Sequence, residues 1–176
     1  ASQFAVKIIQ LEGKVNAAVG RNVGVNHSKG DVLFFIDGDM EILPDFYEHV
    51  FNGVGKLSYP FSNGFWIDRL YDGNFNFLYS EDINLPEKPF FSSTTGGLMI
   101  IQRELWESVG GMDERLTRSQ DHDLGFRLEK KGFPSKRYNK LFAIHHTVSY
   151  FERNRLGNFL FSKALFSQGI LMRKHL

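Results

Sequence analysis

The sequence predicts an α/β fold in a single domain, with a mainly parallel sheet flanked by helices. A strand-like segment, a segment with helical spacing and a continuous apolar run follow one another within the first 36 residues. Such a strand–helix–strand unit is typical of a parallel sheet with a right-handed crossover. The chain has 176 residues, which suits one domain with a sizeable core.

The composition narrows the class of protein further. Hydrophobic residues make up 42% of the chain and charged residues 23%, which is typical of a globular protein. The net charge of +1 gives no electrostatic case for nucleic acid as a partner. The chain contains no cysteine, so a disulfide framework and a thiolate metal site are excluded. No apolar run approaches the roughly 20 residues that span a bilayer.

The first elements are expected in the order strand, helix, strand, helix. Residues 4–9 (FAVKII) predict a strand, and residues 14–30 carry apolar residues at helical spacing before Lys29-Gly30 ends the helix. Residues 32–36 (VLFFI) are a continuous apolar run, which indicates a strand buried on both faces. A second helix is expected to begin at residues 43–45 (LPD), with proline near its first position.

The pattern loosens over residues 57–92, where we expect a long loop because no period is sustained. Ten aromatic residues lie between Tyr59 and Phe91. They hold this loop against the sheet, or they form a wall for a ring-shaped or lipid-linked substrate. The sequence leaves both interpretations open.

Regular structure is expected again from residue 97 onward. The predicted elements are a strand at 97–101 (GLMII), a helix at 103–109 (RELWESV), a helix at 119–132 (SQDHDLGFRLEKKG) and a strand at 141–145 (LFAIH). Ser119 is a candidate N-cap of the fourth predicted helix, at 119–132. Residues 1–150 are predicted to form the domain, and residues 151–176 an amphipathic helix packed on it. Contact with a membrane surface is the alternative role of this helix.

Two pairs of acidic residues are candidates for chemistry. Asp37 and Asp39 follow the apolar run directly, at the edge of the sheet where α/β proteins bind ligands. A divalent cation would offset the repulsion between them, whereas an acidic turn is the alternative interpretation. Asp121 and Asp123 lie in the first turn of a predicted helix, where the helix dipole favours negative charge.

Three segments, in this order and at this spacing, carry a resemblance to a known family. They are GRNVGVNHSKGDVLFFIDGDMEILPDF, TGGLMIIQRELWESVGGMDERL and SQDHDLGFRLEKKGF. Together they resemble the family 2 glycosyltransferases, which have the GT-A (Rossmann-like) fold with a mixed, mainly parallel sheet. The similarity covers most of residues 13–149 and implies an inverting transferase that uses a nucleotide sugar, most commonly a UDP-sugar, with Mn²⁺ or Mg²⁺.

The resemblance implies specific roles for the acidic residues. Asp37 would lie near the donor ribose, and Asp39 would bind the metal that bridges the two phosphates of the donor. Asp121 would act as the general base that removes the proton from the acceptor hydroxyl. The family usually has Glu-Asp at this position, whereas this chain has Gln120-Asp121. Asp123 is expected to cap its helix or to bind nearby basic groups.

Other matches extend the expected donor site. Arg21 matches a segment that faces the donor nucleotide, although it could also be an ordinary surface arginine of a helix. Gly96 and Gly97 match a loop beside the donor sugar, where glycine lets the backbone approach the ligand. His145 is favoured over His146 as a further metal ligand, because adjacent strand residues point to opposite faces.

One part of the family pattern is missing from the sequence as given. Family members usually have a strand, a helix and a second strand before the segment that opens this chain. The resemblance therefore predicts a domain that is truncated at its N-terminus and whose pocket for the nucleotide base is half built.

The aromatic stretch and the tail favour the synthesis of a bacterial surface polysaccharide or glycolipid on a saccharide or lipid-linked acceptor. We expect a cytoplasmic location, with peripheral contact at the inner membrane face as a secondary expectation. One alternative is a phosphotransferase of the haloacid dehalogenase type, but Met40 stands where that class usually has Thr or Val. The other alternative is a non-catalytic nucleotide-sugar-binding or assembly module with the same fold.

Overall fold

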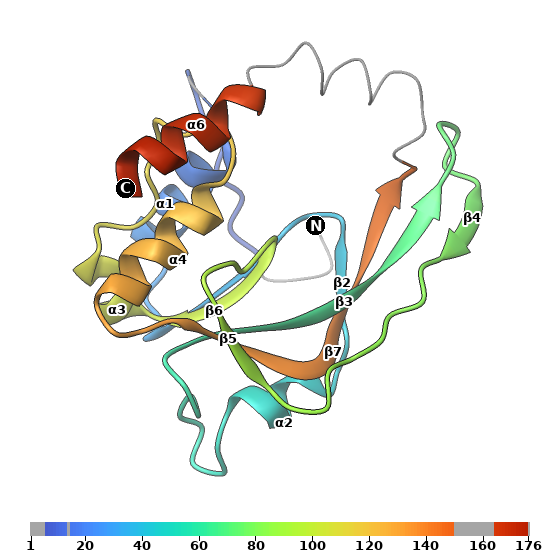
Figure 1. Cartoon of the computed structure of the whole chain (residues 1–176), viewed down its shortest axis with the longest axis horizontal. Coiled ribbons are helices and arrows are strands. Elements are labelled where there is room, and N and C mark those ends of the chain that lie inside the picture. Colours follow the sequence, from blue (N-terminus) through green and yellow to red (C-terminus); the bar gives the residue numbers. More distant parts are fainter. Residues whose placement is uncertain (1–5, 14, 150–163, 176) are drawn as a thin grey trace.

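The computed structural model of the chain describes residues 6–13, 15–149 and 164–175 (Figure 1). Its sheet has seven strands in the order β1-β6-β3-β7-β2, with β4 beside β3 and β5 beside β7. The strands are β1 (Val32–Ile36), β2 (Met40–Ile42), β3 (Phe61–Tyr71), β4 (Phe77–Ser80), β5 (Phe90–Ser92), β6 (Leu98–Gln102) and β7 (Ser135–Val148). The helices are α1 (Ala17–Asn26), α2 (Phe46–Val50), α3 (Arg103–Ser108), α4 (Gln120–Lys130) and α6 (Ala164–His175).

The sheet is mixed, as predicted, but the expectation that it is mainly parallel is wrong. Among the described strands only β3 and β7 pair in parallel, and the other five pairs are antiparallel. The parallel prediction depended on a strand at residues 4–9 beside β1. Residues 6–12 instead have irregular backbone, and β1 pairs with β6, which runs in the opposite direction.

Strand β6 lies at the centre of the core because its side chains alternate between two buried clusters. Met99 and Ile101 pack with residues of α1, α3 and α4, whereas Leu98 and Ile100 pack with residues of α2 and β7. Figure 1 accordingly shows α1, α3, α4 and α6 grouped together, with α2 in a separate position. The predicted strand at 97–101 and the helices after it are therefore found where the sequence placed them.

Strand β1 is not buried on both faces, contrary to the prediction from its apolar run. Leu33 is 5% exposed, but Phe34 and Ile36 are 39% and 38% exposed. In the described part of the chain β1 pairs with β6 alone, so its other edge carries no neighbouring strand. A strand at the edge of a sheet has fewer neighbours to cover its side chains, which explains the partial exposure.

The expectation of a long loop over residues 57–92 is also wrong, because much of this segment forms β3, β4 and β5. The alternation of residues that marks a strand was hidden because β3 contains register shifts on both sides of Phe65. Gly64 lies so close to the Phe142 ring that a Cβ there would stand 2.3 Å from it, so only glycine fits. A bulge of this kind changes which face a side chain points to, and alternation then fails as a signal.

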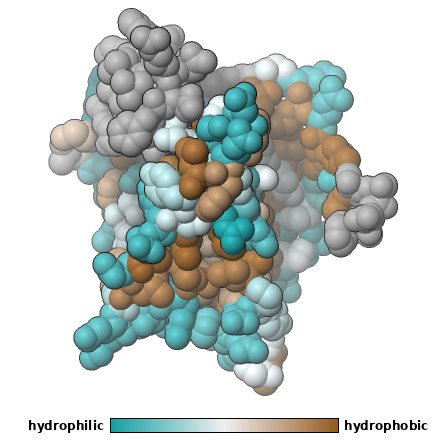
Figure 2. Space-filling view, turned by 90° about the vertical axis from the view of Figure 1, so that its right-hand side faces the viewer, coloured by the Kyte–Doolittle hydropathy of each residue, from teal (hydrophilic) through white to brown (hydrophobic). Residues whose placement is uncertain are grey.

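Apolar side chains remain exposed on the hairpin of β3 and β4. Phe75 at its tip is 77% exposed, and Phe77 and Tyr79 are 57% and 48% exposed. Figure 2 shows the side of the molecule that carries β4, where apolar and hydrophilic atoms alternate over the surface. Some of the ten aromatic residues between Tyr59 and Phe91 thus lie on the surface rather than in the core.

The end of the chain returns to the domain through α6. Leu171 is 5% exposed, and Lys174 and His175 contact the carboxylate of Asp123 on α4. The amphipathic tail was predicted from residue 151, but residues 150–163 lie outside the described part of the chain. The division into a domain and a tail therefore stays a prediction. No helix among the described residues is both long and apolar enough to cross a membrane.

Candidate active site

The turn that joins β1 to β2 carries Asp37 and Asp39, directly after the strand as predicted. The Met40 N–H donates to the Asp37 carbonyl at 3.1 Å and closes the turn. The Asp37 N–H donates to the Gly97 carbonyl at 3.1 Å, and the His146 N–H donates to the Asp39 carbonyl at 2.7 Å. The two side chains are 46% and 54% exposed. The backbone of this turn is therefore fixed while both carboxylates stay open to a ligand.

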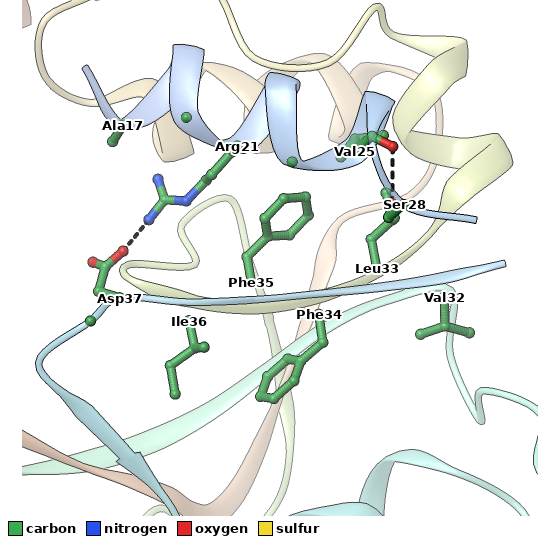
Figure 3. A pocket seen from close by; sticks show the side chains of 13 residues that line it. Ala17, Arg21, Val25, Ser28, Val32, Leu33, Phe34, Phe35, Ile36 and Asp37 are labelled. Atoms are coloured by element: carbon green, nitrogen blue, oxygen red, sulfur yellow. Dashed lines mark hydrogen bonds and ion pairs between the residues drawn. The ribbon is translucent and has the colours of Figure 1, made fainter. Parts of the chain in front are cut away.

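Asp37 is held from two sides, by Arg21 (Figure 3) and by Gly97. Arg21, on α1, donates from Nη2 to its Oδ1 at 2.5 Å. A Cβ added at Gly97 would stand 2.2 Å from its Oδ2, so the carboxylate occupies space that only glycine leaves free. This ion pair lies at one end of a cavity of about 500 Å³ between α1 and the unpaired edge of β1. The Arg21 side chain is 14% exposed and pairs with Asp37. Arg21 is therefore not an ordinary surface arginine of a helix, which was the alternative interpretation.

Asp39 faces His145 across the pairing of β2 with β7. The two atoms Asp39 Oδ2 and His145 Nε2 are 3.3 Å apart. The other nitrogen of the ring, Nδ1, lies 2.8 Å from Oδ1 of Asp68 on β3, which pairs with His145 in the parallel register of β3 and β7. A hydrogen bond at Nδ1 fixes the orientation of the ring and leaves Nε2 directed at Asp39.

His146 points to the opposite face, as the alternation of strand residues predicts. Its Nδ1 lies 2.8 Å from the Tyr71 hydroxyl and its Nε2 lies 3.3 Å from Glu41 Oε2. These contacts separate His146 from the carboxylate of Asp39. The geometry therefore brings the side chain of His145, and not that of His146, to the Asp39 carboxylate.

The described residues contain no group of three or more His, Asp or Glu side chains that could hold a metal by itself. The two donor atoms of Asp39 and His145, 3.3 Å apart, still have a separation that suits ligands of one cation. Two neighbouring ligands at about 2.1 Å from an octahedral ion stand about 3 Å apart. Mg²⁺ in particular is often held by one or two protein groups plus substrate phosphates and water. The residues present therefore fit a metal that arrives with a diphosphate.

Asp121 begins α4 and points toward the loop before β6. Its Oδ2 accepts a hydrogen bond from the Gly96 N–H at 3.1 Å, and its Oδ1 lies 3.4 Å from His122 Nδ1. Burial raises the pKa of Asp121, but the His122 imidazole and the Gly96 N–H together lower it by more than burial raises it. The pKa of Asp121 therefore lies below its ordinary value. Asp121 is therefore ionised at neutral pH, as a proton acceptor must be.

The segment Gly96-Gly97 joins the two halves of the site. Gly97 touches the Asp37 carboxylate, and Gly96 donates to the Asp121 carboxylate. Gly96 has φ +68°, a conformation that favours glycine, and its missing side chain leaves room for the Trp66 ring. Residues that are 84 positions apart in the sequence thus meet on neighbouring glycines, and the acidic turn and the start of α4 form one site.

The remaining residues at the start of α4 have structural roles. Ser119 occupies the N-cap position but has φ +60° and makes no side-chain cap bond, so the predicted capping by its hydroxyl is wrong. Gln120 is 7% exposed and donates from Nε2 to the Leu116 carbonyl, which an ionised Glu could not do. Asp123 binds basic groups, Arg127 among them, which is one of its two predicted roles.

Four residues at this site were missed from the sequence: Trp66, Asp68, His122 and Arg137. Asp68 carried one signal, since an acidic residue interrupts the apolar run FWIDRLY. Trp66 and Arg137 carried none, because their positions depend on the pairing of β3 with β7 and on the bulge near Phe65. His122 is the chain neighbour of Asp121 on α4, so adjacency was a signal that could have drawn attention to it.

The fold and this arrangement place acidic side chains at the edge of a mixed sheet, beyond the end of a strand, where α/β proteins commonly bind ligands. The model of the family described as "Glycosyl transferase family 2" matches residues 1–154. The chain belongs to this family.

The curated relatives that match are also glycosyltransferases. An uncharacterized glycosyltransferase of Haemophilus influenzae is 26% identical over 146 residues, which are 71% of this chain and 45% of the relative. The amylovoran biosynthesis glycosyltransferase AmsB of Erwinia amylovora is 26% identical over 167 residues, 89% of this chain and 55% of the relative. The chain thus spans about half the length of these proteins.

The solved structures include one described as GalNAc-T7 with UDP, GalNAc and Mn²⁺. It superimposes with a TM-score of 0.57 at 14% sequence identity, over 76% of this chain and 30% of the solved chain. At this identity the similarity shows the fold, and it confirms the predicted GT-A fold. Its bound UDP, GalNAc and Mn²⁺ are properties of that protein.

Proposed function

We propose that the chain carries the catalytic site of an inverting, metal-dependent glycosyltransferase. It moves a sugar from a nucleoside diphosphate donor, a UDP-sugar in the first instance, to an acceptor hydroxyl. The observation that carries this proposal is the Gly96-Gly97 segment, which touches the carboxylates of Asp37 and Asp121 at once. A donor site and a proton acceptor on two sides of one short segment are what a single displacement at a sugar carbon requires.

The donor side is formed by Asp37 and Asp39. Asp37, fixed by Arg21, accepts hydrogen bonds from hydroxyls of the donor ribose. Asp39 and His145 hold Mn²⁺ or Mg²⁺, which supplies positive charge to the diphosphate that leaves. The half-buried backbone of Gly96 and Gly97 would lie beside the donor sugar.

The acceptor side is formed by Asp121. Its ionised carboxylate takes the proton from the acceptor hydroxyl while that oxygen forms a bond with the anomeric carbon. The bond from this carbon to the diphosphate oxygen breaks on the opposite face, so the configuration at the carbon inverts. The proton ends on Asp121, and the negative charge ends on the released nucleoside diphosphate.

The biological setting is proposed from the relatives and the composition. The similarity to an amylovoran biosynthesis enzyme supports a role in surface polysaccharide or glycolipid synthesis in bacteria. This role places the chain in the cytoplasm, with peripheral contact at the inner membrane face where a lipid-linked acceptor would lie. A saccharide acceptor in solution is the alternative partner.

The test is calorimetric titration of UDP, GDP, dTDP and CDP into the chain, with Mn²⁺ and again with chelator. We expect one nucleotide to bind in a metal-dependent way, and Asp39→Ala to lose this binding. Glu41→Ala is the matched control, since Glu41 follows the same turn but contacts His146 instead. Binding that survives chelator and Asp39→Ala would contradict the metal role of Asp39. The non-catalytic alternative requires binding without any turnover of the sugar nucleotide.

A further inference from the structure

A second cavity adjoins the candidate active site on the side away from α1. It has a volume of about 250 Å³ and is lined by two aromatic residues, two isoleucines, three acidic residues and one arginine. The aromatic and charged residues are Phe65, Trp66, Asp68, Glu81, Asp82 and Arg137. Pockets for drug-sized ligands measure roughly 300–1,000 Å³, so this cavity suits a single small ring.

Phe65 and Trp66 are neighbours on β3, and both line the cavity. Adjacent residues of a regular strand point to opposite faces, but the register shifts on both sides of Phe65. The Arg137 guanidinium lies 5.4 Å from the centre of the Phe65 ring and 5.9 Å from that of Trp66. It donates to Asn63 Oδ1 and to the Thr94 carbonyl, each at 3.3 Å. The arginine is therefore held in place as part of the wall.

The cavity connects to both halves of the active site. The Trp66 ring fills the space where a Cβ of Gly96 would lie, and the Gly96 N–H donates to Asp121. Burial lowers the pKa of Arg137, and the nearby charge of Asp121 opposes this effect. On the other side, Asp68 contacts His145 at 2.8 Å. A molecule in the cavity thus lies between the proposed base and the proposed metal ligand.

The lining determines which chemistry the cavity can bind. The lining has three acidic residues and one arginine, whose guanidinium already has two partners, so its net negative charge would repel a phosphate or carboxylate ligand. Carboxylates accept hydrogen bonds from hydroxyl groups, and the apolar face of a sugar ring packs on an aromatic ring. A neutral sugar offers both of these features.

We propose that this cavity is the acceptor subsite and that it binds a neutral sugar ring against Trp66, with its hydroxyls on Asp68, Glu81 and Asp82. The proposal rests on the proposed function, since it names the acceptor of that same reaction. It states that the part of the acceptor bound in this cavity is an uncharged sugar and not the phosphate of a lipid carrier.

The experiment is ligand-observed saturation-transfer NMR on the whole chain with the diamagnetic ion Mg²⁺, with and without UDP. The neutral probes are methyl β-D-glucopyranoside and methyl β-D-galactopyranoside, and the anionic probes are methyl β-D-glucuronide and dodecyl phosphate. We expect at least one neutral probe to bind at least about fivefold more tightly than either anionic probe. Trp66→Ala should weaken this binding about tenfold, which is the loss of one stacked ring, about 1.4 kcal/mol.

Two further variants keep the test independent of folding defects. Tyr79→Ala removes an aromatic ring that is 48% exposed on the neighbouring strand β4, and should leave the binding unchanged. Glu81→Lys changes an exposed lining residue, and should weaken the neutral probe while strengthening the glucuronide. Thermal unfolding of each variant checks that the fold is kept.

Three results would overturn the proposal: no binding of either neutral probe with or without UDP, neutral binding that Trp66→Ala leaves intact, or tighter binding of an anionic probe. UDP titration in the same samples separates this inference from the proposed function. Metal-dependent UDP binding without glycoside binding removes the acceptor subsite and leaves the transferase. Glycoside binding at Trp66 without UDP binding keeps the sugar subsite and counts against the donor site.

Discussion

Two carboxylates in the first turn of α4 have opposite surroundings. Asp121 faces the Gly96-Gly97 segment, and its side chain is 19% exposed beside His122. Asp123 faces the core, is fully buried, and contacts three basic side chains at 2.7–2.8 Å, namely those of Arg127, Lys174 and His175. Burial raises the pKa of Asp123, but these partners lower it by more than burial raises it, so the pKa lies below its ordinary value.

The difference shows how one turn of a helix serves both the site and the packing. Residues two apart on a helix point in different directions, so the same residue type meets different neighbours. Asp123 fastens α6 to α4 and thereby fixes the end of the helix that carries Asp121. We therefore expect a change at one carboxylate to affect turnover and the same change at the other to affect stability.

The largest expected effect is that of Asp121→Asn on turnover. The amide keeps the shape of the side chain but cannot take a proton, so kcat should fall by about 10³-fold, within the usual range for a lost general base. The Kd for the nucleotide should stay unchanged. Asp123→Asn is the matched control on the same helix, compared at a temperature where both variants are folded.

The next effect is that of Asp123→Asn on stability. Removing one charge from a buried ionic cluster should cost about 3 kcal/mol, at the low end of the usual range because the cations keep partial contact with water. Denaturant unfolding at pH 7 measures this change. Because the folded-state pKa of Asp123 is lowered, the advantage of the wild type should persist above about pH 4 and disappear as the pH falls further. An advantage independent of pH would contradict the ionic account.

A smaller effect is expected for Gly97→Ala, which tests the contact with Asp37. The added Cβ would stand 2.2 Å from Asp37 Oδ2, so the carboxylate must move away from its position beside Arg21. We expect UDP to bind about tenfold more weakly, a loss of about 1.4 kcal/mol. Gly53→Ala, which has open space around it, should have no effect.

The smallest effect is that of His122→Gln, which changes the pH dependence more than the rate. The His122 imidazole lowers the pKa of Asp121, so its loss should raise that pKa. The acid limb of the kcat/KM profile should then move to higher pH, while the rate at pH 7.5 stays within about twofold. A profile that does not move would show that His122 does not act on the base.

The sequence predicted those parts of the site that follow a local pattern. Asp37 and Asp39 come after an apolar strand, and Asp121 begins an amphipathic helix, so both could be located without tertiary information. The helices and strands with unbroken patterns were likewise found, including α1, β6 and α4.

The rest depended on contacts between distant residues. The bulge near Phe65 removed the alternation that would have revealed β3, and with it the positions of Trp66 and Asp68. The apolar run of β1 misled the prediction, because such a run is typical of a parallel strand buried on both faces, whereas β1 pairs antiparallel with β6 and is partly exposed. His145 and His146 could be separated only as a preference until β3 placed Asp68 beside one and Tyr71 beside the other.

The most direct test of the account is the configuration of the sugar when it first leaves the donor. The chain would be mixed in turn with α-linked UDP-glucose, UDP-galactose, UDP-N-acetylglucosamine and UDP-N-acetylgalactosamine. Time-resolved NMR would then follow the anomeric proton of the sugar that is released from the donor. An inverting displacement assisted by Asp121 predicts that the β product forms first, and that Asp121→Asn abolishes it. An α product formed first, or a β product that Asp121→Asn leaves unchanged, would contradict the account.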